Sequence, residues 1–305
     1  MPKKRKASRV SVSFVPPGAN TSTTQEEAPF GSHLDKSFTI PKSLRDVSAK
    51  YVEAINDWHF SMVNDVGRNQ FYEDCMRNVI HSGSRVLDIG TGTGILAIIA
   101  ARLGCQWVVT VEANRSMADL ARSIIDQNKF SSKITVLHKL STELSITDFP
   151  NKKKPNVLIS EIFGTLMLGE GAHDYIFDAR ERLLTKPCRV IPLWGRQLAT
   201  LIECPTLHSV SSANSWSGIA LNGLNTFRDT VNMIHSKQLG FRMKDVAYTT
   251  LSEPVCLLDV NFESFHPVEL PFKVVAKVQT KQKGVVHAVL LTWECFGLIT
   301  VFAWH

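Results

Sequence analysis

Residues 85–94 read RVLDIGTGTG, and this stretch decides the fold. A short run with β-branched residues at 85–90 predicts a strand, and the glycines Gly90, Gly92 and Gly94 alternate with polar residues. A strand, a tight turn and a helix start produce this pattern, because glycine accepts backbone angles that other residues avoid. Glycines also let the backbone approach a ligand, and a helix N-terminus favours negative groups. An ordinary strand-to-helix turn is the alternative interpretation.

Strands and helices alternate on both sides of this turn. A helix is predicted at 92–104, and further elements are predicted in the order strand 106–112, helix 115–130, strands 133–139 and 155–161, helix 172–184 and strand 188–192. Apolar residues at three- and four-residue spacing predict helices between Leu44 and Ile80, with a break at Gly67. Alternating strands and helices are typical of an α/β fold with a doubly wound parallel sheet.

The pattern changes after Pro192, where the helical units stop. Extended, alternating segments follow at 196–203, 254–262, 270–280 and 284–296. They predict an antiparallel β domain over 193–305, with irregular material near 206–245. The α/β domain then covers 36–192.

The net charge of +6 comes mostly from the N-terminus. The first ten residues carry +5, from Lys3, Lys4, Arg5, Lys6 and Arg9, so the remainder sums to only +1. The nearly neutral remainder of the chain therefore lacks the broad basic face of a nucleic-acid binder. Residues 1–35 contain few large apolar groups and are expected to be a disordered basic tail. The basic run PKKRK in this tail is either a nuclear-import signal or simply a solvated, disordered start of the chain. A cytoplasmic protein is expected, with the nucleus as a second location if the run is an import signal.

The spacing of the cysteines and the length of the apolar runs exclude further classes of protein. Six scattered cysteines form no C-x-x-C pair, which predicts neither a metal site nor a disulfide framework and favours a reduced intracellular protein. No apolar run approaches the roughly 20 residues of a membrane helix, and no apolar core follows the basic start as in a signal peptide. No membrane partner is therefore expected.

A second informative stretch, residues 160–173, reads SEIFGTLMLGEGAH. Glu161 and Glu170 stand nine positions apart, and the residues between them are apolar or small and carry no charge. Carboxylates in apolar surroundings lose hydration or shift their pKa upward, so a cation is expected between them. The alternatives are two solvated loop acids, or a helix-capping role for Glu170.

Acidic residues flank the glycine turn. Asp88 stands just before it, and Glu112 ends the next predicted strand, where an acid suits a ribose hydroxyl pair. Nicotinamide dinucleotides use G-x-G-x-x-G here, whereas this chain has G-x-G-x-G and an aspartate that would repel a pyrophosphate. S-adenosylmethionine carries no phosphate, and its ammonium suits Asp88. Its carboxylate then requires a basic partner.

These motifs resemble those of the protein arginine methyltransferases. The resemblance rests on VLDIGTGTGIL, on Glu112 and on SEIFGTLMLGEGA, whose EIF-x-T-x-x-x-GEGA form is most similar to the branch called arginine methyltransferase seven. Upstream, residues 59–68 match the family's H-x-x-M-x-x-D-x-x-R element, and the resemblance covers about 50–295. It implies a nucleotide-fold methyltransferase domain followed by an antiparallel β-barrel, with a helical dimerisation arm near 206–245.

The resemblance also implies roles for individual residues. Glu161 and Glu170 would be the catalytic pair that holds and activates a substrate guanidinium. Arg68 would pair with the cofactor carboxylate, and Met62 would lie beside the reacting arginine. The other residues implied to bind S-adenosylmethionine are His59, Asp88, Gly90, Gly92, Glu112, Ser141 and Thr142, of which Ser141 and Thr142 match positions around the adenine. Phe163 and Leu166 are further candidate walls of the substrate pocket.

The implied activity is methyl transfer to arginine in arginine-rich proteins such as histones or RNA-binding proteins, stopping at monomethylarginine, by a homodimer. One departure stands out. The family carries a His-Trp loop well after the strand matching HAVLLTWE, whereas this chain ends at Trp304-His305, so a truncated barrel is expected. The alternatives are a catalytically impaired scaffold protein, favoured by the short C-terminus, and a small-molecule methyltransferase, against which the paired glutamates count.

Overall fold

The structure is a computed structural model that describes residues 55, 57–228, 243–266, 274–298 and 301–304. These residues belong to one compact unit, Ala54–His305. The predicted disordered tail and the first part of the predicted helices at 44–80 lie outside the described residues. Within the described part, no helix is long and apolar enough to cross a membrane.

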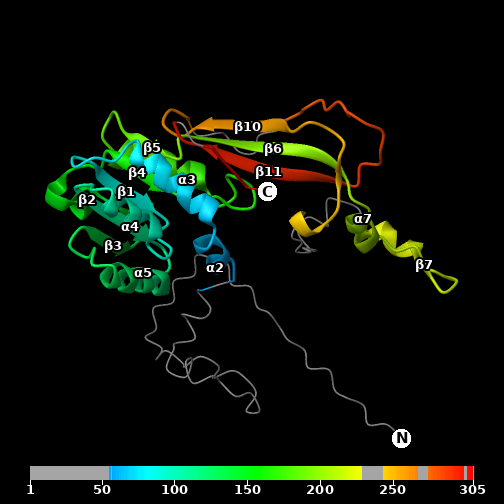
Figure 1. The fold of residues 1–305 in the computed structure, drawn as a ribbon, viewed down its shortest axis with the longest axis horizontal. Helices are drawn as coiled ribbons and strands as arrows, with labels where there is room; N and C mark the ends of the chain where they lie inside the picture. The colour runs from blue at the N-terminus through cyan, green and yellow to red at the C-terminus, as the bar shows by residue number, and fades with distance from the viewer. Residues whose placement is uncertain (1–54, 56, 229–242, 267–273, 299–300, 305) are drawn as a thin grey trace, which may run out of the picture. The chain divides into compact units, whose positions relative to one another are not determined.

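A five-stranded parallel sheet forms the first half of this unit (Figure 1). Its order is β3-β2-β1-β4-β5, with β1 at Arg85–Ile89, β2 at Trp107–Glu112, β3 at Ile134–His138, β4 at Val157–Ser160 and β5 at Arg189–Ile191. Chain order reverses at β1, which pairs with both β2 and β4. In such sheets ligands bind beyond the carboxyl ends of the strands at this switch point. The predicted doubly wound α/β fold is confirmed.

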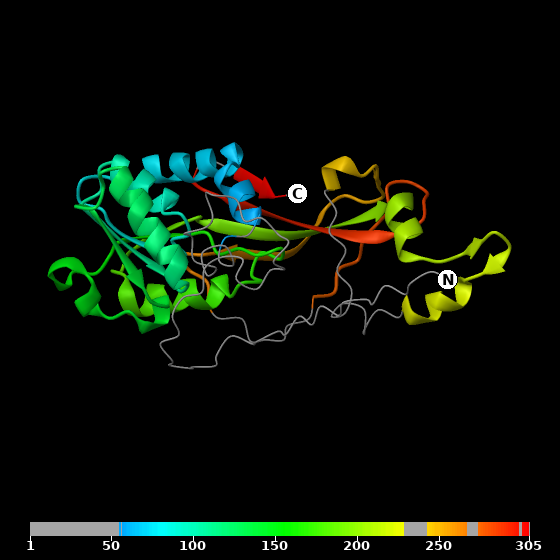
Figure 2. The same cartoon turned by 90° about the horizontal axis from the view of Figure 1, so that it is seen from below.

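Helices pack on both faces of the parallel sheet. The structure places α2 at Asp57–Val63, α3 at Val66–Arg77, α4 at Ile95–Arg102, α5 at Arg115–Gln127 and α6 at Ala172–Asp178, which continues into a π-helical turn at Ala179–Leu183. Figure 2 shows α3 and α6 on opposite faces. Apolar side chains from both layers meet strands that are buried along most of their length, as is usual for parallel sheets.

The predicted helix break at Gly67 is wrong by a few residues. The chain breaks at Asn64–Asp65, and Gly67 lies in the first turn of α3. The Asp65 side chain accepts a hydrogen bond from the Arg68 backbone N–H at 2.9 Å and so caps the helix. An N-cap aspartate satisfies an amide that has no partner within the helix, and this contribution outweighs the tendency of a glycine to interrupt a helix.

Antiparallel strands form the second half of the unit. The sheet order is β10-β6-β11-β12 with β9 also on β6, from β6 at Trp194–Glu203, β9 at Thr249–Thr250, β10 at Val255–Asn261, β11 at Ala288–Phe296 and β12 at Val301–Trp304. Only Pro192 and Leu193 separate β5 from β6. The predicted antiparallel pairing is present, whereas closure into a barrel, its truncation and the division into domains remain predictions.

The strand predicted at 270–280 is not found in its described part. Residues 274–279 have no regular structure, and Thr280 makes only an isolated bridge to Ser252. Val274 and Val275 remain 46% and 77% exposed. Alternating apolar residues form a stable strand only when a partner strand and a packing face are present, and here these side chains stay largely in solvent.

The segment predicted to be irregular contains short elements. It begins with α7 at Pro205–Ser211, followed by the hairpin strands β7 at Ser215–Trp216 and β8 at Ile219–Ala220, a 3₁₀ segment at Asn222–Arg228 and another at Met243–Asp245. Figure 1 shows α7 and β7 extending from the end of β6 that is remote from the parallel sheet. Trp216 and Leu224 are 70% and 62% exposed, so this arm carries large apolar side chains in solvent.

Candidate active site

The glycine turn lies at the carboxyl end of β1. The backbone N–H groups of Gly90 and Thr91 both donate to the Val111 carbonyl at 3.1 Å, which fixes the turn against β2. Gly92 has a φ of +53°, and a Cβ added there would meet no atom within 4 Å. The backbone therefore faces open space at this glycine, as a ligand-binding turn requires.

Asp88 lies in β1 directly below the turn and is fully buried. Thr110 Oγ1 donates to Asp88 Oδ2 at 2.7 Å, whereas Oδ1 has no hydrogen-bond partner in the described part of the chain. Burial raises the pKa of Asp88 from 3.8 to about 7, although the Thr110 hydrogen bond partly opposes this shift. A buried carboxylate oxygen without a donor is costly, so this one is suited to a cationic or hydrogen-bonding ligand.

Glu112 ends β2 and lies beside the same turn. Its Oε2 accepts the Gly92 N–H at 3.0 Å, and its Oε1 accepts the Asn114 N–H at 2.9 Å. Each carboxylate oxygen can accept a second hydrogen bond. The side chain is thus held in place by the backbone on both sides, and it retains the capacity to bind a hydroxyl pair.

Ser141 and Thr142 form a short 3₁₀ turn with Glu143 after β3. Ser141 is buried and its Oγ lacks a partner among the described residues, whereas Thr142 is exposed. Nη2 of Arg182 donates to the carbonyl oxygens of Ser141 and Thr142 at 3.2 Å each. Arg182 thereby ties this turn to the end of the α6 segment, a link that the sequence did not indicate.

Arg68 and Glu161 bind each other. Nε and Nη2 of Arg68 both donate to Glu161 Oε2, at 3.1 and 2.5 Å, and their side chains are only 8% and 7% exposed. Burial raises the pKa of Glu161, the Arg68 charge and hydrogen bonds oppose this, and the nearby Glu170 charge adds to the rise. The sequence assigned Arg68 to a cofactor carboxylate and Glu161 to a substrate cation, but did not predict their direct pairing.

Tyr72 is a further residue of the site that sequence reasoning missed. The Arg68 guanidinium carbon lies 5.7 Å from the centre of the Tyr72 ring, and the Tyr72 hydroxyl donates to the Ser160 carbonyl at 3.0 Å. Burial raises the pKa of the Tyr72 hydroxyl. Tyr72 therefore connects α3 with the residue that precedes Glu161, and only its helical spacing from Arg68 could have indicated it.

Glu170 occupies the far end of the loop between β4 and α6. It is exposed, and it makes no hydrogen bond or ion pair in the described part of the structure. A Cβ added at Gly164 would lie 3.1 Å from Glu170 Cγ, so the two ends of the loop approach each other. The loop thus brings together the two predicted catalytic glutamates, one buried and paired, the other open to solvent.

The structure places the remaining candidates as follows. His59 and Met62 lie on α2 and are half-buried, and their predicted roles at the site stay predictions. Leu166 is 49% exposed. Phe163 is buried, with its ring centre 5.6 Å from that of Phe262 and 5.5 Å from that of Trp293. Its predicted role as a pocket wall stays a prediction, and the structure shows its ring packed against residues of the antiparallel half.

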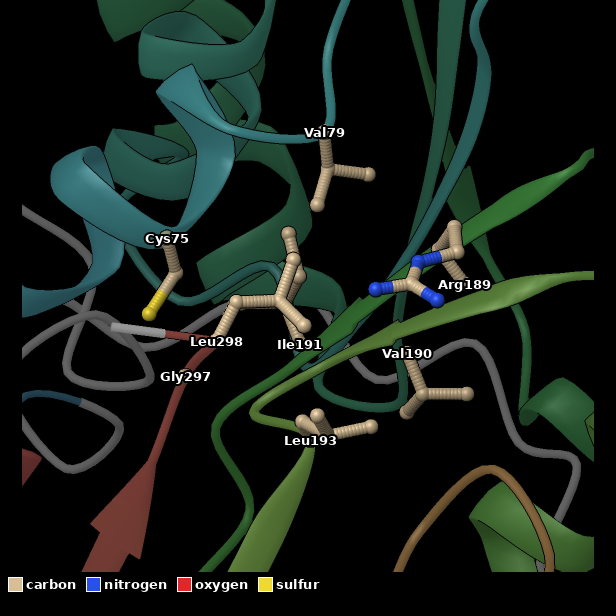
Figure 3. Close-up of a pocket in the computed structure, with 8 residues that line it drawn as sticks. All are labelled: Cys75, Val79, Arg189, Val190, Ile191, Leu193, Gly297 and Leu298. Atoms are coloured by element: carbon tan, nitrogen blue, oxygen red, sulfur yellow. The ribbon is translucent and has the colours of Figure 1, made fainter. Parts of the chain in front are cut away.

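A small pocket lies apart from these residues (Figure 3). Residues in or just after α3, β5 and β11 line it, namely Cys75, Val79, Arg189, Val190, Ile191, Leu193, Gly297 and Leu298. Arg189, its only charged residue, pairs with Glu263, with Nε 3.4 Å from Oε1. The pocket contains none of the candidate site residues.

The residues at the carboxyl end of the sheet fit S-adenosylmethionine. Three buried side-chain atoms in the described part of the chain lack a hydrogen-bond partner, and two of them, Asp88 Oδ1 and Ser141 Oγ, belong to predicted cofactor residues. The third, His173 Nδ1, belongs to α6, which packs on the Ser141 turn. The described residues contain no cluster of three His, Cys, Asp or Glu side chains suited to a metal ion. Unpaired donors and acceptors with open space at Gly92 suit an organic ligand that carries an ammonium and hydroxyls.

Comparisons with known proteins identify related methyltransferases. A family model described as ribosomal protein L11 methyltransferase (PrmA) matches residues 73–169, from α3 to the glutamate loop. Protein arginine N-methyltransferase 7 of Aedes aegypti is 31% identical over 248 residues, which is 76% of this chain and 36% of that protein. Its Drosophila melanogaster counterpart is 31% identical over 283 residues, which is 86% of this chain and 40% of that protein. The chain belongs to the protein arginine methyltransferase family.

Other family members extend the comparison. The arginine N(omega)-methyltransferase of Streptomyces achromogenes subsp. streptozoticus is 30% identical over 78% of this chain and 63% of its own length. The chain thus spans 36% to 63% of the length of these three relatives. The Trypanosoma brucei PRMT1 enzyme-prozyme heterotetrameric complex with AdoHcy superposes with a TM-score of 0.66 at 20% identity, covering 83% of this chain and 77% of that chain. Arabidopsis thaliana protein arginine methyltransferase 10 gives a TM-score of 0.58 at 22% identity, over 80% and 74% of the two chains. These two likenesses show the same fold.

Proposed function

We propose that this chain transfers a methyl group from S-adenosylmethionine to arginine guanidinium nitrogens of proteins and stops at monomethylarginine. The observation that carries the proposal is the glutamate loop, in which the buried Glu161 and the exposed Glu170 lie near each other beyond the glycine turn. The membership in the arginine methyltransferase family supports the same activity.

The residues around the turn would bind the cofactor, which supplies an electrophilic methyl group on its sulfonium. Asp88 would accept from the ammonium with its unpartnered Oδ1. Arg68, which has five N–H donors and uses three of them in its bonds to Glu161 and Asn69, would bind the carboxylate. Glu112 would bind the ribose, and the turn of Ser141 and Thr142 would bind the adenine.

The two glutamates would then act on the substrate arginine. A guanidinium stays protonated at neutral pH and is a poor nucleophile, because its pKa is above about 12. Two carboxylates can hold the guanidinium through paired hydrogen bonds, orient one nitrogen towards the methyl group and draw positive charge away from that nitrogen. Arg68 fixes Glu161 for this task, and the exposed Glu170 is accessible to an arriving side chain.

Labelled-methyl transfer to an arginine-rich peptide tests the proposal. The wild-type chain is expected to label the peptide but not its lysine-substituted copy. Glu170→Gln should lose most of this transfer while still binding S-adenosylmethionine. The exposed Glu253→Gln serves as the control, because Glu253 pairs with Lys281 on the antiparallel half. Absence of labelling by the wild type, or full activity of Glu170→Gln, would count against the proposal.

A homodimer is part of the proposed function. The arm near 206–245 exposes Trp216 and Leu224, and exposed apolar groups of this size favour a protein partner. One related structure is titled as a heterotetrameric complex. Sedimentation at micromolar concentration should give a dimer for the wild type and a monomer for Trp216→Ser with Leu224→Ser. A monomeric wild type would contradict this part of the proposal.

A further inference from the structure

We infer that Gln197 and Trp293, two residues of the antiparallel sheet, are positioning residues that set where Glu161 and Glu170 stand. The inference rests on the proposed function and extends it. It assigns to the second half of the chain a direct part in the geometry of the glutamate loop.

Two side chains of the sheet bind the backbone of this loop. Gln197 Oε1 accepts the Met167 N–H at 2.8 Å. Trp293 Nε1 donates to the Gly164 carbonyl at 3.0 Å. Within the loop itself, the described backbone bonds are short turns, from Gly169 N–H to the Leu166 carbonyl and from Gly171 N–H to the Leu168 carbonyl. Such turns set the local shape of the loop, so its placement on the protein depends on contacts from outside the loop, which include these two bonds and the Arg68–Glu161 pair.

The two side chains from the sheet are themselves fixed. Gln197 on β6 and Trp293 on β11 are direct cross-strand partners. They are 8% and 5% exposed. Gln197 Nε2 donates to the Thr292 carbonyl at 2.9 Å, so its amide accepts at one end and donates at the other. These partners allow only one orientation of the amide, and the side chain cannot rotate away without leaving a buried amide or carbonyl unsatisfied.

Packing keeps the loop against the sheet at the same place. A Cβ added at Gly195, two residues before Gln197, would lie 2.5 Å from Met167 Sδ and 3.1 Å from the Phe262 ring. Met167 is fully buried, and Phe163 packs against Trp293. Phe163 and Met167 therefore pack against the antiparallel half, so this part of the loop has little room to shift while its two hydrogen bonds are intact.

The spacing of the two anchor points relates each of them to one glutamate. Gly164 lies three residues after Glu161, and Met167 lies three residues before Glu170. Glu161 has a second fixed point in Arg68. Glu170 makes no described bond of its own, so the place of its carboxylate depends on the backbone that Gln197 holds. Loss of the Gln197 bonds is therefore expected to affect methyl transfer more than loss of the Trp293 bond.

The test compares steady-state kinetics on an arginine peptide for Gln197→Met, Gln197→Glu and Trp293→Phe. Gln197→Met removes both hydrogen bonds and should lower kcat/KM on the order of a hundredfold, as expected for a misplaced catalytic group. Gln197→Glu retains the acceptor for the Met167 N–H but loses the amide donor to the Thr292 carbonyl, so it should recover only part of the loss. Trp293→Phe keeps an aromatic ring, although a smaller one, and loses the donor, and it should cost less. Binding of S-adenosylmethionine should remain within about twofold in all three, because none of these side chains contacts the glycine turn.

Thr200→Val is the matched control, since Thr200 is also a buried polar residue of β6. Equal rates for Gln197→Met and Thr200→Val, or a parallel loss of cofactor binding, would overturn the inference. Hydrogen exchange of residues 161–171 provides a readout independent of activity, and it should speed up in Gln197→Met but not in the control. If the wild type transferred no methyl group to arginine, the proposed function would fail, and exchange would still decide whether Gln197 holds the loop.

Discussion

Arg68 and Glu161 meet through a single oxygen. Oε2 of Glu161 accepts both Nε and Nη2 of Arg68, whereas Nη1 of Arg68 turns to Asn69 Oδ1 at 3.0 Å. The guanidinium thus does not form the parallel two-oxygen pair that arginine and carboxylates often make. Arg68 thus holds Glu161 by one oxygen, and the charge of Glu161 is compensated inside the protein before any substrate arrives.

Removal of one partner of this pair should be strongly destabilising. Arg68→Met leaves a buried carboxylate without its cation and should lower the free energy of unfolding by about 3–5 kcal/mol. Adding Glu161→Gln should restore part of that loss. Urea unfolding of the two single variants and the double variant measures the coupling.

Arg77→Met is the control, because the Glu73–Arg77 pair lies on the surface of α3 and such helical pairs contribute only about 0.3–0.5 kcal/mol. If Arg68→Met proved no more destabilising than Arg77→Met, the buried pair would have no structural role.

The raised pKa of Asp88 gives stability a defined pH dependence. The carboxyl titrates at about 7 in the folded chain and near 3.8 when unfolded. Between these values the folded state holds a proton that the unfolded state has released, so stability from this group is complete below about pH 4 and is lost as the pH rises towards 7. Asp88→Asn should therefore lose less stability than the wild type between about pH 5 and pH 8.

Urea unfolding at the two pH values checks this, with the exposed Asp126→Asn as the control. Identical pH dependence in the wild type and Asp88→Asn would show that Asp88 titrates normally.

Two glycines of the turn should respond differently to alanine. At Gly90, with a φ of +85°, a Cβ would lie 2.7 Å from Ile162 Cγ2, so Gly90→Ala should destabilise the fold. At Gly92 a Cβ meets no atom, so Gly92→Ala should cost only the backbone strain of about 1–2 kcal/mol. If S-adenosylmethionine occupies the space at Gly92, that milder variant should bind it much more weakly.

Thermal unfolding and calorimetry on both variants separate the two effects. Unchanged cofactor affinity in a folded Gly92→Ala would place the cofactor elsewhere.

The number of methyl groups added should depend on Glu170. Glu170→Asp shortens the acid and enlarges the space around the guanidinium, so monomethylation should slow and some dimethylation should appear. Glu161→Asp should lower the rate without adding a second methyl, since Arg68 still fixes that carboxylate. Mass spectrometry of a peptide with one arginine records the product. Abundant dimethylarginine from the unmodified chain would contradict monomethylation and leave arginine methylation intact.

Local patterns predicted the parallel sheet well because each strand-turn-helix unit is specified by nearby residues. The strand predicted at 85–90 is observed at Arg85–Ile89, and the strand predicted at 106–112 is observed at Trp107–Glu112. The helix break was misplaced at Gly67, although Asp65 is a residue type that favours N-cap positions and could have indicated the true boundary.

Contacts between distant residues were outside the reach of sequence reasoning. Arg68 and Glu161 are 93 residues apart, and the sequence assigned each of them a role with a separate charged ligand, without any sign that they meet. Gln197 and Trp293 alternate along predicted strands like any inward-facing residues, so nothing in the chain marked them as partners of the loop. The type of a residue shows which interactions its side chain can make. Which partner it meets depends on the strands and helices that the fold brings next to it.

The junction of two residues between β5 and β6 has a consequence for protein engineering. Pro192 and Leu193 leave no linker, and Leu193 is tied on both sides, donating to the Phe296 carbonyl at 2.9 Å and accepting from Phe262 N–H at 2.8 Å. Both partners of Leu193 belong to the antiparallel half, and Gln197 and Trp293 of that half bind the glutamate loop. A chimera that joined this parallel sheet to another protein's antiparallel half would therefore receive foreign side chains beneath its glutamate loop. Successful recombination should require the crossover to lie outside 161–296, so that both sides of the contact are inherited together.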